Sequence, residues 1–361
     1  MPEKLKDMFF TKSSVDALAT EIKRFYKKFD KKRFDSLVFD KQFTSLELKA
    51  KMRHITLCLH QLLPESFPHA INILKKAAPK VKGFEAMCLP DYVELYGMEN
   101  WDESMAAMVL FTKYSSSEFA IRPFIIKDPK RAMAFMKKMA GDKDHKVRRF
   151  ASEGCRSRLP WAMALPPFKK DPSLIIPVLE KLKNDDSEFV RRSVANNLND
   201  ISKDNPEMVL DICKTWSGKS DKTDWIIKHA CRTLLKKGNT EAMLLFGFGD
   251  PGRIKIKKLK CDKHKLKIGD KTQFNFILDV DAKKTCKVRL EYAVDFVKSG
   301  GKVSRKVFKI TENNYAPGEH TFTRNHSFAD MSTRKHYPGK HGITIIVNGI
   351  EKARTDLSLA K

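Results

Sequence analysis

The spacing of apolar residues changes once along the chain, near residue 250, and this change divides the sequence into two kinds of structure. Before it, apolar residues recur every three or four positions, as at Val15, Leu18 and Ile22, which is typical of helices buried along one face. After it they alternate with polar residues, as in 273–280 (QFNFILDV), which is typical of strands. The glycine- and proline-rich segment 247–252 (GFGDPG) separates the two patterns. We therefore predict a helical domain at 1–250 and an all-β domain at 251–361.

The helical half repeats one short motif, in which an apolar residue is followed by basic residues. Two strong and two weak copies lie at residues 144–151, 187–194, 224–231 and 117–122. Their central apolar residues are separated by 26, 43 and 37 positions, intervals that scatter around those of HEAT-like helix-pair repeats. In each copy the apolar residues form one stripe, such as Val190, Val194 and Leu198, which a single repeat cannot bury. The sequence predicts a mainly α chain that begins with a HEAT-like solenoid.

The second half combines short alternating segments with regular turn signals. Gly300-Gly301, Pro317-Gly318 and Pro338-Gly339 interrupt the apolar runs. Short strands over some 110 residues, with turns at this spacing, favour a small immunoglobulin-like sandwich.

The net charge indicates a polyanionic partner. The chain has 70 Lys+Arg against 44 Asp+Glu, a net charge of +26, which favours nucleic acid or an acidic membrane surface. No apolar run approaches the ~18–20 residues that span a bilayer. The first residues (MPEKLK) lack the apolar core of a secretion signal, so we expect a cytoplasmic protein. The seven cysteines contain no CxxC pair, and we expect neither a metal nor a cofactor.

Several carboxylates share a helical face with arginines. Arg149 and Glu153 are four positions apart, as are Glu118 and Arg122, and Arg192, Asn196 and Asp200 follow one another at the same interval. An ordinary surface pair of this kind contributes only ~0.3–0.5 kcal/mol.

Two observations point beyond ordinary surface pairing. Arg148 and Arg191 add more positive charge than the pairs require, and in the pair formed by Arg149 and Glu153 the acid follows the base, which is the weaker order. Trp161 follows Pro160 directly, where its ring could project into a groove.

These segments resemble a known family. Residues 117–124, 147–154, 158–161 and 190–200, together with 292–298 and 334–341, are similar to the AlkC branch of the HEAT-like repeat alkylbase DNA glycosylases. The resemblance implies excision of 3-methyladenine and 3-methylcytosine from double-stranded DNA, without a deep pocket for a flipped base. It places Glu118, Glu153, Trp161 and Asp200 at the active-site positions, with Arg149 beside them.

The chemistry of such a reaction suits these residue types. A base methylated at N3 is cationic and leaves readily, and the sugar becomes cationic as the bond breaks. Carboxylates stabilise that charge and orient water, and an aromatic face holds a cation. We therefore expect Asp200 and Glu153 to stabilise the sugar, Glu118 to hold the lesion and Trp161 to contact it.

The residues expected to contact DNA come from both halves. They are Arg148, Arg149, Arg191 and Arg192 in the repeats, and Lys298, Arg334, Lys335, His336 and Tyr337 in loops of the β-domain.

Two other functions remain open. The first is a non-catalytic HEAT scaffold that binds nucleic acid or an acidic protein, which leaves the carboxylates and Trp161 without a purpose. The second is an adaptor at a membrane surface, for which the sequence lacks a basic amphipathic helix. No heptad pattern or apolar patch suggests an oligomer or an obligate protein partner, so we expect a monomer.

Overall fold

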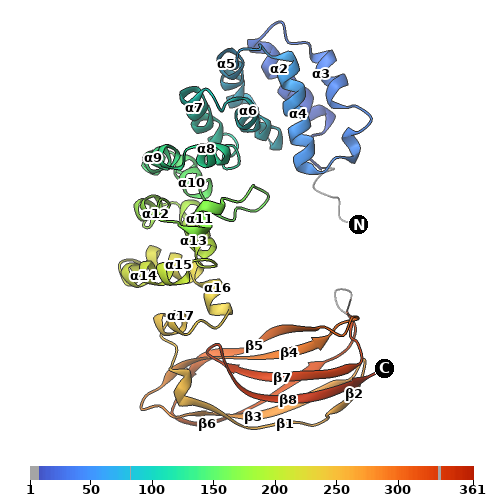
Figure 1. Ribbon diagram of the computed structural model, residues 1–361, viewed down its shortest axis with the longest axis vertical. Coiled ribbons are helices and arrows are strands. Elements are labelled where there is room, and N and C mark those ends of the chain that lie inside the picture. The colour runs from blue at the N-terminus through green and yellow to red at the C-terminus, as the bar shows by residue number, and fades with distance from the viewer. Residues whose placement is uncertain (1–7, 82, 332–334) are drawn as a thin grey trace. The chain divides into compact units, whose positions relative to one another are not determined.

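The computed structural model describes residues 8–81, 83–331 and 335–361, and it consists of helices followed by strands (Figure 1). It forms two compact units, one of residues up to Val209 with Thr215–Ala230, the other of Leu210–Lys214 with Cys231–Lys361. No described helix combines the length and apolar character needed to cross a bilayer.

The first unit is built from helices alone. They are α2 (Lys12–Phe25), α3 (Lys31–Val38), α4 (Leu48–Leu62), α5 (Phe67–Ala77), α6 (Cys88–Tyr96), α7 (Trp101–Thr112), α8 (Arg122–Lys127), α9 (Pro129–Met139), α10 (His145–Glu153), α11 (Pro166–Lys170), α12 (Ile176–Leu182), α13 (Glu188–Ile201) and α15 (Asp221–Ala230), with α14 (Pro206–Trp216) divided between the units. Short 3-10 helices cover Phe43–Ser45, Ala78–Lys80 and Phe84–Met87.

The repeat motif forms helices that stack in chain order. The Asp144 side chain caps α10 by accepting a hydrogen bond from the Lys146 backbone, as expected at a helix start. On α13 the predicted stripe of Val190, Val194 and Leu198 is fully buried. Helix α10 packs against α9, α12 and α13, and α13 packs against α15. Figure 1 shows these helices following one another along the unit, so the predicted solenoid is confirmed.

The second unit is a β-sandwich with two further helices, α16 (Arg232–Lys236) and α17 (Thr240–Leu245). Its strands are β1 (Ile254–Cys261), β2 (Lys265–Lys267), β3 (Lys271–Val280), β4 (Cys286–Val297), β5 (Val303–Tyr315), β6 (Gly318–Ser327), β7 (Gly339–Val347) and β8 (Ile350–Ala360), preceded by a 3-10 turn at Pro251–Arg253. One sheet has the order β1-β3-β6 and the other β2-β8-β7-β4-β5. Only β2 and β8 pair in parallel among the described strands.

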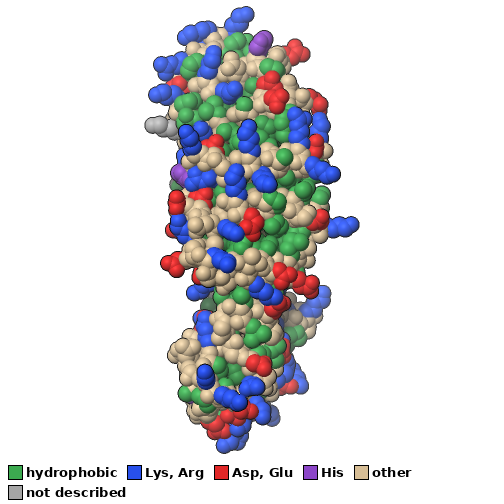
Figure 2. Space-filling view, turned by 90° about the vertical axis from the view of Figure 1, so that its left-hand side faces the viewer, with side chains coloured by type: hydrophobic (Ala, Val, Ile, Leu, Met, Phe, Trp, Pro, Cys, Tyr) green, Lys and Arg blue, Asp and Glu red, His purple; other side chains and the backbone are tan. Residues whose placement is uncertain are grey.

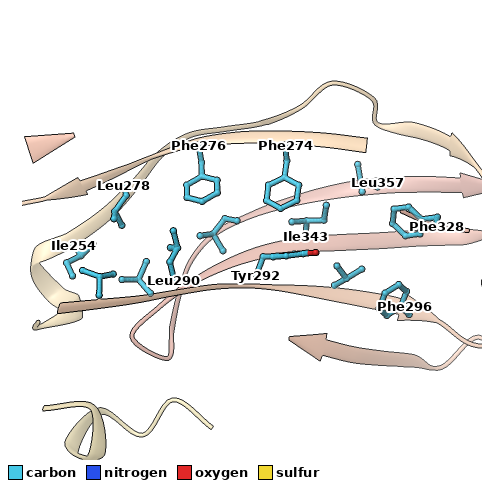
Figure 3. Packing of buried hydrophobic residues seen from close by; sticks show 14 of the residues in the cluster. Ile254, Phe274, Phe276, Leu278, Leu290, Tyr292, Phe296, Phe328, Ile343 and Leu357 are labelled. Carbon is cyan, nitrogen blue, oxygen red and sulfur yellow. The ribbon is translucent and has the colours of Figure 1, made fainter. Parts of the chain in front are cut away.

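The core of the sandwich lies between its two sheets. Phe274 and Phe276 of β3 face Tyr292 and Phe296 of β4, with Phe328 at one end (Figure 3). On β3 the buried residues alternate with exposed or half-buried ones, which is the pattern that the sequence predicted, whereas β4 is buried at the consecutive positions 290–294.

The strands begin at Ile254, close to the predicted boundary, but the second unit begins earlier in the chain. The turn between α16 and α17 touches the turn between β7 and β8. A Cβ atom built on Gly238 would lie 2.4 Å from the Cα of Gly349, and both glycines have positive φ angles. The Asn348 side chain also donates a hydrogen bond to the Gly249 carbonyl. These contacts join the last two helices to the sandwich.

Candidate active site

Two arginines bring the three predicted carboxylates together. Arg149 forms ion pairs with Glu118 and with Glu153, whose Oε1 lies 3.5 Å from its Nη2. Arg156 places Nη1 2.6 Å from the same Glu153 oxygen and Nη2 2.8 Å from Oδ2 of Asp200. Acid and base therefore alternate in the order Glu118, Arg149, Glu153, Arg156, Asp200. The carboxylates converge although they lie in separate segments of the chain.

Each carboxylate makes one further contact, which is a hydrogen bond for Glu118 and Glu153 and an ion pair for Asp200. These contacts join Ser116 Oγ to Glu118 (2.6 Å), Ser193 Oγ to Glu153 (2.6 Å) and Lys203 Nζ to Asp200 (2.9 Å). Three cations, Arg149, Arg156 and Lys203, thus face three carboxylates, and the cluster has no net charge. An acidic cluster without these cations would repel a polyanion, whereas this one does not.

The inner part of the cluster is almost closed to solvent. The side chains of Glu153 and Asp200 are 7% and 2% exposed, and that of Glu118 is 14% exposed. Burial alone would lower the pKa of Arg156, but the attraction of Glu153 and Asp200 outweighs it, so the pKa is raised. Arg156 therefore stays charged, and the buried carboxylates keep their counter-charge.

Arg122 does not pair with Glu118 as the spacing predicted. It is fully buried, and its guanidinium donates to three backbone carbonyls of the loop after α10. Nε donates to Met163 O (2.7 Å), and Nη1 donates to Gly154 O (3.0 Å) and Arg156 O (2.9 Å). Burial lowers the pKa of Arg122 to about 10, which still leaves it charged at neutral pH. This arginine fixes both ends of the loop that carries Trp161.

Trp161 stands at the tip of this loop. Its side chain is 65% exposed, and its backbone adopts a left-handed conformation with φ 64°. The Nζ atom of Lys49, from the first turn of α4, donates to the Trp161 carbonyl (2.9 Å) and lies 5.0 Å from the centre of the Phe119 ring. Lys49 and Arg122 together hold the loop from two sides.

We expect Lys49→Met to reduce the rate of any reaction that uses Trp161 by about two- to tenfold, because one hydrogen bond contributes roughly 0.5–1.5 kcal/mol. Lys49→Arg, which keeps a donor, should retain the wild-type rate. Kinetics of the three proteins under saturating substrate measure the effect. Equal rates for Lys49→Met and wild type would show that the loop tip needs no support from α4.

A pocket of about 370 Å³ adjoins Glu118. Its aromatic walls are Phe84, Phe119, Trp161 and Phe189, and its other lining residues are Met87, Thr112, Ser115, Ser116, Glu118, Lys146 and Arg149. The Arg149 guanidinium lies over the Phe189 ring, 4.5 Å from its centre. This volume is at the lower end of the range of small-molecule sites, ~300–1,000 Å³. The aromatic walls suit a flat group, and Glu118 is the one carboxylate in a lining that also holds Lys146 and Arg149.

Arg148 and Arg191, which come one position before Arg149 and Arg192, have a structural role. Arg148 binds both carboxylate oxygens of Asp185 (2.6 and 2.9 Å) and donates to two loop carbonyls, and Arg191 donates to the carbonyls of Asp185 and Asp186. Both guanidiniums thus tie the loop before α13, and contact of Arg148 and Arg191 with DNA stays a prediction. Arg192 pairs with the exposed Glu188, one turn away, rather than with Asp200.

The β-domain residues divide between surface and core. Lys298 and Lys335 are exposed, and Tyr337 is half-buried. His336, predicted as a DNA contact, is instead buried, with its ring 5.5 Å from that of Phe296 and its backbone N–H bonded to Asp330. Arg334 lies outside the described residues.

Net charge does not locate the site. Figure 2 shows one face of the molecule, on which Lys and Arg side chains are spread among Asp and Glu. Sequence reasoning missed Arg156, although its spacing of three from Glu153 was a usable signal. It also missed Phe189 and Lys49, which reach the site from other segments, and no local spacing marks them.

Two of the three comparisons with known proteins cover nearly the whole chain. The family model "Uncharacterised protein YhaZ, C-terminal Ig-like domain" matches residues 255–361. The uncharacterized protein YhaZ of Bacillus subtilis (strain 168) is 43% identical over 356 residues, which is 98% of this chain and 99% of that protein. A solved structure, Pseudomonas fluorescens alkylpurine DNA glycosylase AlkC bound to DNA containing an abasic site analog, is 36% identical with a TM-score of 0.86. That match covers 99% of this chain and all of the other.

Proposed function

The chain belongs to the family that contains YhaZ and the alkylpurine DNA glycosylase AlkC, and from this premise we propose that it is a DNA glycosylase that removes alkylated bases. More specifically, we propose that it hydrolyses the N-glycosidic bond of 3-methyladenine and 3-methylcytosine in double-stranded DNA, as a step of base excision repair, without drawing the base into a deep pocket.

One observation carries the proposal: the convergence of Glu118, Glu153 and Asp200 beside an aromatic pocket. When the bond between C1′ and the base nitrogen breaks, its electron pair goes to the methylated base, which becomes neutral. The positive charge passes to the sugar. Carboxylates fixed in place before the reaction stabilise this charge without reorganisation.

The residues then have distinct tasks. Asp200 and Glu153 supply the negative field at the sugar and orient the attacking water, whose oxygen forms the new bond to C1′ and whose proton is released. Glu118, at the pocket, attracts the cationic base before it leaves, and the exposed ring of Trp161 contacts the base or sugar. Arg149 and Arg156 hold the carboxylates apart and in place.

DNA contacts in this proposal come from Arg149 and Arg192 in the repeats and from Lys298, Lys335 and Tyr337 in the sandwich. Arg192, Lys298 and Lys335 are exposed, while Arg149 and Tyr337 are half-buried, and basic and tyrosine side chains at such positions suit contacts to phosphates.

The direct test is base release from duplexes that contain a single 3-methyladenine or 3-methylcytosine, with no cofactor added. We expect free base and an abasic site from both lesions, and no release from undamaged DNA. Protein that binds these duplexes and releases no base would instead support the non-catalytic scaffold.

A further inference from the structure

A row of polar side chains begins with Arg149 at the pocket and continues along the stacked helices to α15. Arg149, Arg192 and His229 occupy the same place in successive copies of the repeat, two positions after the central apolar residue. On α13, Phe189, Arg192 and Asn196 share one face, because they are three and four residues apart. Oδ1 of Asn196 lies 3.2 Å from Nε2 of His229. The face that lines the pocket is thus continuous with α15.

Helix α15 presents one aromatic and two basic side chains together. Trp225, Lys228 and His229 are spaced by three and four residues and so lie on one face. The Trp225 and His229 rings are parallel within 2°, with centres 5.4 Å apart, and Trp225 is 37% exposed. The opposite face, with Ile226 and Ile227, is buried in the unit. We call Trp225, Lys228 and His229 the α15 platform.

The platform differs from the corresponding parts of the earlier repeats. Arg148 and Arg191, which occupy the position of Lys228, hold the loop that precedes α13. Lys228 is exposed, and no ion pair joins it to another residue in the part of the chain that the structure describes. The copy of the repeat on α15 therefore has a basic residue, Lys228, that does not hold a loop. It also has an exposed ring, Trp225, on the same face.

We propose that the α15 platform binds the sugar–phosphate backbone of the damaged DNA strand to one side of the lesion. Lysine and histidine donate to phosphates, and the apolar face of an exposed indole ring buries the carbon atoms of a deoxyribose. Helices stacked ~8–10 Å apart place α15 two steps, or roughly 16–20 Å, from α10. At ~3.4 Å per nucleotide of one strand, the contact falls about five to six nucleotides from the lesion. This inference rests on the proposed glycosylase function.

The test compares Trp225→Ala and Lys228→Ala with wild type on three nested duplexes. The long duplex has about ten base pairs on each side of a 3-methyladenine, and each of the two short duplexes ends about three base pairs from the lesion, one on each side. On the long duplex we expect Trp225→Ala to raise KM about tenfold with kcat unchanged, because the variant loses the apolar contact between the indole ring and the sugar. Lys228→Ala should reduce the magnitude of the slope of log affinity against log salt concentration by about one. On the duplex shortened at the platform side, both variants should equal wild type.

The control is Phe25→Ala, which removes another exposed ring of the same unit, 42% exposed at the end of α2, and should change neither KM nor binding. Thermal unfolding establishes that each variant is folded, and Lys228→Ala, at an exposed position, tests the platform even where Trp225→Ala unfolds. Three results would contradict the proposed role of the platform. They are an unchanged KM of the variants on the long duplex, an equal rise of KM on all duplexes, and a change in kcat alone. Wild type that binds the long duplex more tightly than the short one, but releases no base, would refute the glycosylase and leave the platform standing.

Discussion

Replacing Asp200 by Asn is expected to lower the rate of base release by roughly 100- to 1,000-fold, while binding to DNA with an abasic-site analogue stays within about twofold of wild type. The substitution keeps the shape of the side chain and removes one negative charge from a site where charge develops in the transition state. Because the abasic analogue carries no cationic base and no developing charge, its binding does not use that carboxylate. Single-turnover release of 3-methyladenine and a binding titration measure the two effects.

Asp204→Asn is the matched control for this experiment. Asp204 lies four residues after Asp200, just past the end of α13, and pairs with Arg158 at the surface (2.6 Å). The same chemical change there removes only an exposed ion pair, worth ~0–1 kcal/mol, so base release should persist. If Asp200→Asn turned over normally and bound poorly, Asp200 would be a binding residue and its catalytic assignment would be wrong.

Local patterns were enough to predict the secondary structure and the fold class. The stripe of Val190, Val194 and Leu198 predicted a one-sided helix, and α13 buries these residues. Alternation over 273–280 predicted β3 in the same way. The start of the second unit was not predictable, because it depends on the approach of Gly238 to the turn that contains Gly349, more than a hundred residues later.

The members of the site were easier to predict than their partners. Spacing of four predicts that Glu118 pairs with Arg122, but Arg122 is fully buried, and its Nε and Nη1 donate to carbonyls of the Trp161 loop. Glu118 instead pairs with Arg149, 31 residues away. A helical spacing shows which residues share a face, yet it cannot show which neighbouring helix supplies the opposite charge.

Arg156 is the cation that Glu153 and Asp200 share. We expect Arg156→Met to abolish base release and to lower the free energy of unfolding of the helical unit by about 3–5 kcal/mol. The side chain is 8% exposed and binds Glu153 and Asp200 at once. Methionine fills a similar volume but leaves two nearly buried carboxylates without their shared cation. Urea unfolding followed by the helical circular dichroism signal measures the loss of stability.

Arg158→Met is the control, since Arg158 follows two residues later in the same loop and forms a surface pair with Asp204. It should change the free energy of unfolding by no more than about 1 kcal/mol.

Combining Arg156→Met with Asp200→Asn separates stability from catalysis. The double variant removes Arg156 and the Asp200 charge together. Glu153 keeps its ion pair with Arg149, and the Lys203 ammonium that loses Asp200 is 35% exposed, so the double variant should regain a large part of the lost stability. Base release should stay absent, because the carboxylate that faces the sugar is gone. A double variant no more stable than Arg156→Met would show that Arg156 stabilises the fold by packing alone. Normal base release by Arg156→Met would show that Glu153 and Asp200 need no shared cation to act.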